Sequence, residues 1–322
     1  MFSIVIPLYN KAPYIEKAIQ SVLAQTCKEF ELIIVDDGST DNGMEIAQNM
    51  LCAQNPPFGG WWGFAQQNSG VSTARNNGVK AAKYDFIAFL DADDWWAPTF
   101  LEEMKSLITE FPEGALYASS YFKVKNGKNI PAKIGVSDGF EKDYFDYCKT
   151  YATSLWMPVW TGAVVLRKDV FNEMQGFKPQ LKLGEDFDLW VRIALKYKMV
   201  FLNKPLAYYN QDVTQQSRAV GNLHNPQTHV LWNLDYLAEE ERKNTDLKQL
   251  LDNLRVYSLF PYYLSKKYRK NAKTELKKVD WSKQPKSVKR KYKLPIWYLK
   301  LNFQIQKIGS ICKKLILSVK IR

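Results

Sequence analysis

The first hundred residues alternate short apolar runs with amphipathic helical patterns, and this alternation constrains the fold more than any other feature of the chain. Each apolar run has the length of a strand and is followed by polar residues. The predicted strands lie at Ser3–Pro7, Glu31–Val35, Trp62–Gln66 and Phe86–Leu90, with helices near Pro13–Gln25, Asn42–Leu51 and Ser72–Lys83 between them. This order predicts an α/β fold with a parallel, doubly wound sheet.

The fourth predicted strand ends in three carboxylates, Asp91, Asp93 and Asp94. Crowded acids repel one another unless a cation or hydrogen-bond donors lie beside them. The carboxyl ends of parallel strands are also where open α/β sheets bind ligands, and Mg²⁺ or Mn²⁺ binds there through one or two carboxylates and substrate phosphates. We therefore assign function to Asp91 and Asp93, whereas Asp94 is expected to cap the helix that begins near Pro98.

Further polar clusters follow the other predicted strands at Tyr9-Asn10, Asp36-Asp37 and Asn68–Asn76. Because these ends lie side by side in such a sheet, an aromatic ring, carboxylates and an arginine meet there, which suits a nucleotide diphosphate. The sequence contains neither G-x-x-x-x-G-K-[ST] nor G-x-G-x-x-G, which disfavours ATPases and dinucleotide-binding enzymes.

The middle of the chain gives a weaker pattern, and residues 128–155 allow no assignment. Asp188 and Arg192 are four residues apart and are expected to pair on a helix surface. Glu185-Asp186 begins that helix and offers a general base, although first-turn acids are also stabilised by the helix dipole alone. The other expected elements are a helix at Thr99–Glu110, an extended stretch at Ala115–Lys125 with an Asn126-Gly127 turn, a strand ending at Leu166, and short strands at Met199–Leu202 and Ala207–Tyr209.

Charge is distributed unevenly along the 322 residues, which carry a net charge of +12. Residues 266–322 contain 19 Lys and Arg against two acidic residues, so the remaining 26 basic and 31 acidic residues leave residues 1–265 mildly acidic. This balance argues against nucleic acid as a partner of the body. Four scattered cysteines favour a reducing compartment, and we expect neither a signal peptide nor a membrane span.

Five motifs in register together resemble glycosyltransferase family 2, whose members are inverting enzymes of the GT-A fold. They are Ser3-Ile-Val-Ile-Pro7-Leu-Tyr9-Asn10, Val35-Asp36-Asp37-Gly38-Ser39-Thr40-Asp41, Asn68-Ser69-Gly70-Val-Ser-Thr-Ala74-Arg75-Asn76, Phe89-Leu-Asp91-Ala-Asp93-Asp94 and Gly184-Glu185-Asp186. The resemblance covers residues 1–215, with a nucleotide-binding half at about 1–97 and an acceptor half at about 98–215.

The resemblance implies a role for each matching position. The nucleotide side comprises Pro7, Tyr9, Asp36, Asp37, Asn68, Arg75, Asp91 and Ala92, with Tyr9 stacking on the base. Asp93 is expected to hold Mg²⁺ or Mn²⁺, Asp186 to act as the base with Glu185 supporting it, and Trp160, Thr161 and Gly162 to form the acceptor-side turn. The Q-x-x-R-W signature of processive members is missing, and Arg218 is a candidate contact to the diphosphate without a clear match.

The C-terminal part is predicted as a helical extension at 216–265 and a basic amphipathic tail at 266–322. In the tail, Leu301, Ile305, Ile308, Cys312, Leu315 and Val319 form one apolar stripe among lysines. Such a helix is typical of an in-plane anchor on an anionic membrane, although the stripe could also dock on the body or form a short coiled coil.

The resemblance implies a cytoplasmic, nonprocessive, metal-dependent glycosyltransferase, and the basic tail suggests that it is peripheral at the inner face of the cell membrane. It would transfer a sugar from a nucleotide diphosphate sugar, with a UDP-sugar preferred, to a saccharide or a lipid-linked saccharide in surface polysaccharide or glycolipid assembly. The alternatives are a nucleotidyltransferase and a noncatalytic membrane-associated partner protein. The oligomeric state and the role of the loop at 54–62 stay open.

Overall fold

The computed structural model describes residues 1–53, 59–213 and 223–301, and the chain forms two compact units, Met1–Ala238 and Glu239–Arg322. The predicted boundary at residue 215 lies within 214–222, outside the described residues. The predicted division of the chain therefore stays a prediction.

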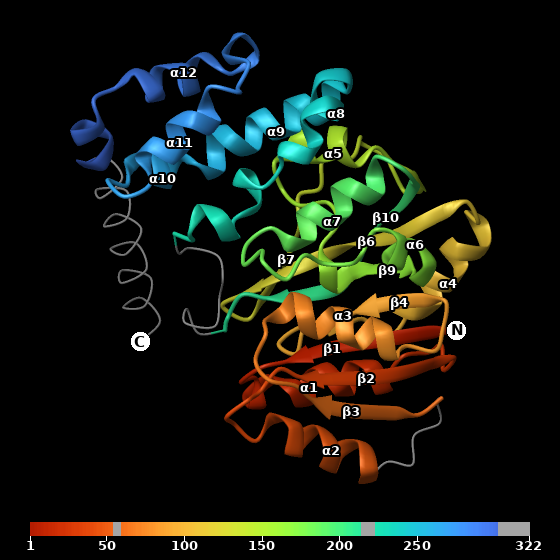
Figure 1. The fold of residues 1–322 in the computed structure, drawn as a ribbon. Helices are drawn as coiled ribbons and strands as arrows, with labels where there is room; N and C mark the ends of the chain where they lie inside the picture. Colours follow the sequence, from red (N-terminus) through yellow and green to blue (C-terminus); the bar gives the residue numbers. More distant parts are fainter. Residues whose placement is uncertain (54–58, 214–222, 302–322) are drawn as a thin grey trace, which may run out of the picture. The chain divides into compact units, whose positions relative to one another are not determined.

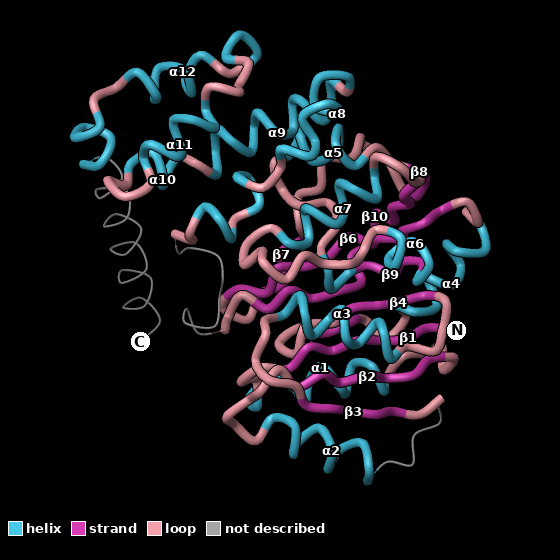
Figure 2. Tube along the Cα trace, in the orientation of Figure 1, coloured by secondary structure: helices cyan, strands magenta, loops and turns pink. Residues whose placement is uncertain are grey.

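The first unit is built on one ten-stranded sheet with helices on its faces (Figure 1, Figure 2). Its main path runs in the order β3-β2-β1-β4-β9-β6-β10-β5, and β7 and β8 pair with β6 and β10. The strands are β1 (Phe2–Leu8), β2 (Phe30–Asp36), β3 (Trp61–Ala65), β4 (Phe86–Phe89), β5 (Trp95–Trp96), β6 (Gly114–Lys125), β7 (Lys128–Pro131), β8 (Lys142–Tyr144), β9 (Val164–Arg167) and β10 (Lys198–Asn210). The helices are α1 (Ala12–Leu23), α2 (Gly43–Ala53), α3 (Val71–Ala81), α4 (Phe100–Glu110), α5 (Tyr147–Ser154), α6 (Lys168–Glu173) and α7 (Glu185–Ala194).

The N-terminal half confirms the predicted parallel arrangement, because β1 pairs in parallel with both β2 and β4, and β2 pairs in parallel with β3. Leu8 lies opposite Asp36, so the polar residues that follow β1 and β2 leave the sheet at the same edge. Helix α3 packs closely on this sheet, since a Cβ atom at Gly78 would lie 2.3 Å from Val5. Strands β1 and β2 are buried along their whole length because both faces of the sheet are covered there, whereas β3, at the end of the strand order, is only partly buried.

The later strands of the first unit make the sheet mixed, since β9 lies between β4 and β6 and is antiparallel to both. The predicted turn at Asn126-Gly127 is confirmed: both residues have positive φ, and they join β6 to the antiparallel β7. The two short strands expected at Met199–Leu202 and Ala207–Tyr209 are one strand, β10, whose register with β6 shifts between Leu202 and Ala207.

Two further expectations are wrong. Asp94 does not cap the helix near Pro98, because the short strand β5 intervenes and the buried Asp94 carboxylate instead accepts a hydrogen bond of 2.7 Å from the Asn210 N–H. Asp188 does pair with Arg192, at 2.8 Å, but it lies completely buried and not on the surface. Lys178 and the Tyr236 hydroxyl also bind this carboxylate, which satisfies its buried charge.

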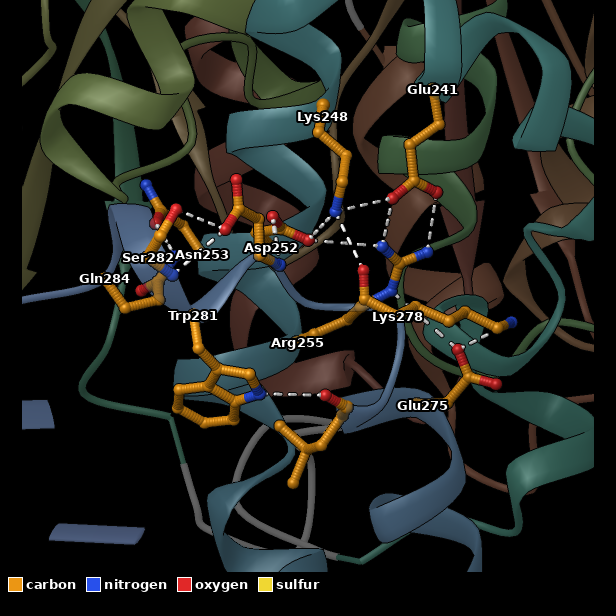
Figure 3. A network of polar contacts seen from close by, with 12 residues as sticks. Glu241, Lys248, Asp252, Asn253, Arg255, Glu275, Lys278, Trp281, Ser282 and Gln284 are labelled. Atoms are coloured by element: carbon orange, nitrogen blue, oxygen red, sulfur yellow. Dashed lines mark hydrogen bonds and ion pairs between the residues drawn. The ribbon is translucent and has the colours of Figure 1, made fainter. Parts of the chain in front are cut away.

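The second unit is helical and consists of α9 (Thr245–Ser258), α10 (Phe260–Leu264), α11 (Arg269–Leu276) and α12 (Lys286–Lys293), preceded by α8 (Ala238–Lys243). Arg255 lies at the centre of a polar network in which Glu241, Asp252 and Glu275 surround its guanidinium group (Figure 3). No helix among the described residues is both long and apolar enough to span a lipid bilayer.

Candidate active site

The loops after β1 and β2 are tied together and leave one aromatic ring in solvent. Asn10, at a positive φ of 50°, accepts a hydrogen bond of 2.8 Å from the Thr40 N–H and donates its own N–H to the Ser39 hydroxyl. Beside it, Tyr9 is 47% exposed, while Pro7 is buried in the strand. An exposed ring on a fixed loop is available for stacking on a planar group such as a base.

Asp36 ends β2 and Asp37 follows it, and the two carboxylates have different environments. The Asp36 carboxylate accepts a single hydrogen bond from the described residues, 2.9 Å from the Ser39 N–H. Asp37 accepts three, each 2.8 Å long, from the Gln66 amide and from the N–H groups of Ser69 and Gly70. Asp37 therefore positions the loop before α3, whereas Asp36 keeps acceptor capacity for a ligand.

Arg75 links the two predicted halves of the site. From α3, its buried guanidinium group donates to Asp91 at 2.6 Å and to Glu185 at 3.4 Å, and it lies 5.3 Å from the centre of the Phe177 ring. Asp91 follows β4, and Glu185 begins α7. A single arginine thus brings the carboxylate expected on the nucleotide side next to the pair expected on the acceptor side.

Asp93 contacts a lysine that the sequence interpretation did not include. The Lys11 ammonium group, at the start of α1, lies 2.5 Å from the Asp93 carboxylate, and both side chains are about 15% exposed. Burial raises the pKa of Asp93, and the charge of Asp91 adds to this effect while Lys11 opposes it. The adjacent Ala92 is buried, so Asp93 is held on a rigid turn.

Glu185 and Asp186 form the first turn of α7, which Gly184 enters with a φ of 81°. Asp186 is neither fully buried nor fully exposed, and its one hydrogen bond to the described residues comes from the Phe187 N–H at 2.7 Å. Desolvation raises the pKa of Asp186 to about 7, and the charge of Glu185 contributes to the rise. A carboxyl group with a pKa near neutrality is matched to general-base catalysis.

The predicted acceptor-side turn consists of buried residues that pack within the fold. Trp160, Thr161 and Gly162 are all buried, and the Gly162 carbonyl accepts a hydrogen bond of 2.6 Å from the indole of Trp96. The Trp160 ring packs between Tyr121 and Tyr209, at centroid distances of 5.1 and 5.0 Å. The place of this turn on the acceptor side stays a prediction. Asn68 lies exposed on the loop before α3. Arg218 lies outside the described residues.

The described residues around Asp93 supply too few donors to enclose a divalent cation by themselves, but they fit a cation that the substrate also binds. The described residues contain no cluster of three or more His, Cys, Asp or Glu side chains that could enclose a metal. Mg²⁺ and Mn²⁺ nevertheless bind through one or two carboxylates when a substrate diphosphate supplies the other oxygens. The Mg²⁺ or Mn²⁺ site at Asp93 therefore stays a prediction that the donor set permits.

The structure adds residues that the sequence interpretation missed. Lys11 directly follows the Tyr9-Asn10 motif, but only the fold shows that it reaches Asp93, 82 residues later. Tyr147 and Tyr151 lie in the segment that allowed no assignment, and their rings pack against Phe187, next to Asp186. No local pattern identified these two tyrosines, because their role depends on the packing of α5 against α7.

Known proteins share both the sequence pattern and the fold. The family model described as glycosyl transferase family 2 matches residues 3–174. An uncharacterized glycosyltransferase of Rickettsia bellii is 28% identical over 251 residues, which cover 75% of this chain and 34% of the relative. Glycosyltransferase GlyG of Streptococcus pneumoniae is 23% identical and is matched over 76% of this chain and 80% of its own length.

The solved structure of S. aureus TarS residues 1–349 in complex with UDP-GlcNAc is similar in fold, with a TM-score of 0.71 at 18% identity. The match covers 93% of this chain and 87% of the TarS chain. This chain spans about a third of the length of the first three curated relatives. The family model covers more than half of the chain, and the expected motifs meet at one edge of the sheet, so the chain belongs to glycosyl transferase family 2.

Proposed function

We propose that this protein is an inverting, nonprocessive, metal-dependent glycosyltransferase that moves a sugar from a nucleotide diphosphate sugar to an acceptor hydroxyl. The observation that carries the proposal is the position of Arg75 between Asp91 and Glu185. The contacts of Arg75 with Asp91 and Glu185, and its charge interaction with Asp186, support a single site for the proposed nucleotide-side carboxylate and the proposed base. Binding and proton transfer need such proximity to act on one substrate pair.

The side chains then have distinct roles in the proposed reaction. Tyr9 stacks on the base and Asp36 accepts a hydrogen bond from it, while Asp91 and Arg75 face the ribose and the phosphates. Asp93 would hold Mg²⁺ or Mn²⁺, which when bound neutralises charge on the departing diphosphate. Asp186 takes the proton of the attacking hydroxyl, and attack opposite the leaving group inverts the anomeric centre.

A UDP-sugar is the proposed donor. The TarS structures of similar fold include complexes with UDP and with UDP-GlcNAc. In this chain the exposed Tyr9 ring follows β1, and the Asp36 carboxylate at the end of β2 keeps free acceptor positions, which suits a base with an N–H donor such as uracil.

A thermal-shift screen tests donor and metal together. UDP, GDP, dTDP and CMP and their sugars are added with and without Mn²⁺, and we expect a selective, Mn²⁺-dependent rise in melting temperature with UDP and one UDP-sugar. Hydrolysis of that sugar nucleotide should then depend on Mn²⁺ and be lost in Asp93→Ala. Stabilisation that is equal for all nucleotides, or turnover unchanged in Asp93→Ala, contradicts the proposal.

The alternative functions have less support. A nucleotidyltransferase would need a Gly-rich basic loop after the first strand, where this chain has Leu8-Tyr9-Asn10. A noncatalytic partner would gain nothing from keeping Asp186 beside Glu185, because two adjacent acids in a desolvated site destabilise the fold.

We also propose that the second unit holds the enzyme on an anionic membrane, on the cytoplasmic face where a lipid-linked saccharide would be the acceptor. Helix α12 carries Lys or Arg at five of its eight positions, and Val288 and Tyr292 pack against the unit's core. Just beyond it Leu299 is buried, while Trp297 and Tyr298 are 69% and 40% exposed. Exposed aromatic rings beside a basic helix are typical of a surface that binds the membrane interface.

Flotation with phosphatidylserine-containing vesicles tests this attachment. The triple variant Lys286→Glu, Arg290→Glu and Lys293→Glu should lose binding by at least about 100-fold, since each basic residue contributes about 1 kcal/mol near an anionic surface. A matched control reverses three other exposed lysines of the same unit, Lys266, Lys267 and Lys270. Equal binding by both variants would rule out α12 as the attachment surface.

A further inference from the structure

Tyr147 is the first residue of α5 and packs against Phe187, the neighbour of the candidate base. Asp146 caps this helix by accepting a hydrogen bond of 2.8 Å from the Lys149 N–H. The Tyr147 ring is 1% exposed and lies 6.5 Å from the ring of Phe187, the residue that follows Asp186. Tyr151, one turn later on α5, lies 6.0 Å from the same ring. Helix α5 therefore presents two tyrosines to the start of α7.

The Tyr147 hydroxyl is one of ten buried side-chain polar atoms that lack a hydrogen-bond partner among the described residues. It is inaccessible to solvent. An unsatisfied buried hydroxyl costs a protein about 1–3 kcal/mol. The Tyr117 hydroxyl, also on a buried ring, instead donates to the carbonyl groups of Phe111 and Gly114. The missing partner of Tyr147 thus calls for a functional explanation.

Asp186, in turn, has acceptor positions that no hydrogen-bond donor among the described residues fills. A carboxylate offers about four acceptor positions, and Asp186 uses one of them for the N–H of its own neighbour, Phe187. The groups that act on it are Glu185 of the same helix, Arg75 of α3, Tyr121 of β6, and Tyr147 and Tyr151 of α5. Arg75 is engaged by Asp91 and Glu185, and the Tyr121 hydroxyl donates to the Met157 carbonyl.

Tyr147 and Asp186 also interact electrostatically. Burial raises the pKa of Tyr147 well above its ordinary value, and the charges of Tyr151 and Asp186 raise it further. The hydroxyl therefore keeps its proton at every pH at which Asp186 can act as a base. It remains a donor while Asp186 becomes an acceptor.

We propose that Tyr147 is a positioning residue. Its hydroxyl is not hydrogen-bonded to Asp186 in this structure, and it donates a hydrogen bond to the carboxylate once Asp186 is ionised, which orients the other carboxylate oxygen toward the acceptor hydroxyl. This inference rests on the proposed glycosyltransferase function for its catalytic meaning, but the hydrogen bond itself can be tested without activity.

The test is Tyr147→Phe, which removes the hydroxyl alone, with Tyr117→Phe as the matched control. In Tyr147→Phe we expect kcat to fall about tenfold, with the donor KM unchanged, and the acidic limb of the pH–rate profile to move up by about one unit, because a donor to the charged form is lost. Its melting temperature at pH 5 should be unchanged or higher, since an unsatisfied group is removed. Tyr117→Phe should lower the melting temperature and leave the pH profile in place.

A thermal measurement separates failure of this inference from failure of the proposed function. Melting temperature is followed from pH 5 to pH 8 for Tyr147→Phe in the wild-type and the Asp186→Asn backgrounds. Loss of the hydrogen bond should make the variant lose more stability than wild type as pH rises, and this difference should vanish in Asp186→Asn. An equal pH effect in both backgrounds, or an unshifted pH–rate profile in an active enzyme, overturns the role of Tyr147.

Discussion

Arg75 and Arg255 are both buried among carboxylates, but their surroundings differ. Arg255 is 2% exposed, and all of its partners are themselves largely buried: Asp252 is 2% exposed, Glu275 is 8% and Glu241 is 12%. Lys248 and Lys278 bind the same acids, so the network is closed (Figure 3). The partners of Arg75, in contrast, keep an open side, with Asp91 27% and Glu185 17% exposed.

The difference separates a structural role from a functional one. A closed network compensates the desolvation of its charges within the protein, and removing one member leaves the others uncompensated. An open network leaves carboxylate oxygens reachable, so a ligand can complete it. We therefore expect variants of the two networks to affect different measurements: unfolding for the Arg255 network and catalysis for the Arg75 site.

The largest effect is expected for Asp186→Asn, which keeps the shape of the base but removes its proton affinity. Transfer activity should fall about 10³- to 10⁴-fold, as for loss of a general base. The free energy of unfolding, in contrast, should rise at pH values where Asp186 is ionised. The folded state raises the pKa of Asp186 to about 7, so its ionisation between about pH 4 and pH 7 costs folding free energy.

The amide variant avoids this cost, and its free energy of unfolding at pH 8 should rise by about 1–2 kcal/mol. Urea unfolding at pH 5 and pH 8, beside initial-rate measurements, checks both parts. A variant that keeps transfer activity, or that is less stable than wild type at pH 8, removes Asp186 from the role of base.

Next in size is Arg255→Met, which should lower the free energy of unfolding by about 3–5 kcal/mol because three buried acids lose their common partner. Urea unfolding of the full chain measures the loss. Arg290→Met, on the exposed surface of α12, is the control and should stay within about 0.5 kcal/mol of wild type. A small effect of Arg255→Met would mean that Lys248 and Lys278 suffice to balance the acids.

For Arg75→Met we expect a smaller change in the free energy of unfolding than for Arg255→Met, together with a loss of activity. The partners of Arg75 can hydrate through their open sides, so unfolding should change by only about 1 kcal/mol. The activity as kcat/KM should drop about 100-fold, since Asp91 and Glu185 lose their common donor. Comparing the two methionine variants in both assays is the direct test of the contrast. It fails if Arg75→Met unfolds the protein as readily as Arg255→Met does.

The smallest effect that we expect is the dependence of kcat/KM on pH. With Asp186 as the base and its pKa near 7, kcat/KM should fall tenfold for each pH unit below about 6.5 and level off above pH 8. Urea unfolding at pH 5 and pH 8 verifies that the protein is folded throughout. A flat profile between pH 5 and pH 8 would show that the group that accepts the proton is not Asp186.

The parts of the fold that sequence could predict are those in which local pattern and burial agree. The strands up to β4 are continuous apolar runs, because both faces of a parallel sheet are covered, and their positions were predicted within a residue or two. The prediction failed where distant chain segments decide the structure. Asp94 has the residue type and position of a helix cap, but the pairing of β5 with β10 directs it to Asn210 instead.

The candidate site likewise contains residues that could be predicted from the sequence and residues that could not. Motif positions such as Asp91, Arg75 and Asp186 could be named from the sequence, and the structure brings Asp91 and Arg75 into contact. Lys11 and Tyr147 could not be named, because a lysine and a tyrosine outside any pattern carry no local signal. Their importance comes from the residues that tertiary packing places beside them.

The three hydrogen bonds that Asp37 accepts have one more consequence, for how the site handles negative charge. Many nucleotide-binding folds place a phosphate at a helix N-terminus, where backbone N–H groups point outward. Here the loop entering α3 directs the Ser69 and Gly70 N–H groups at Asp37, so the protein supplies its own anion at that position. In the proposed function, a diphosphate would then have to be neutralised by other groups, and the candidates among the described residues are Lys11, Arg75 and the proposed cation at Asp93.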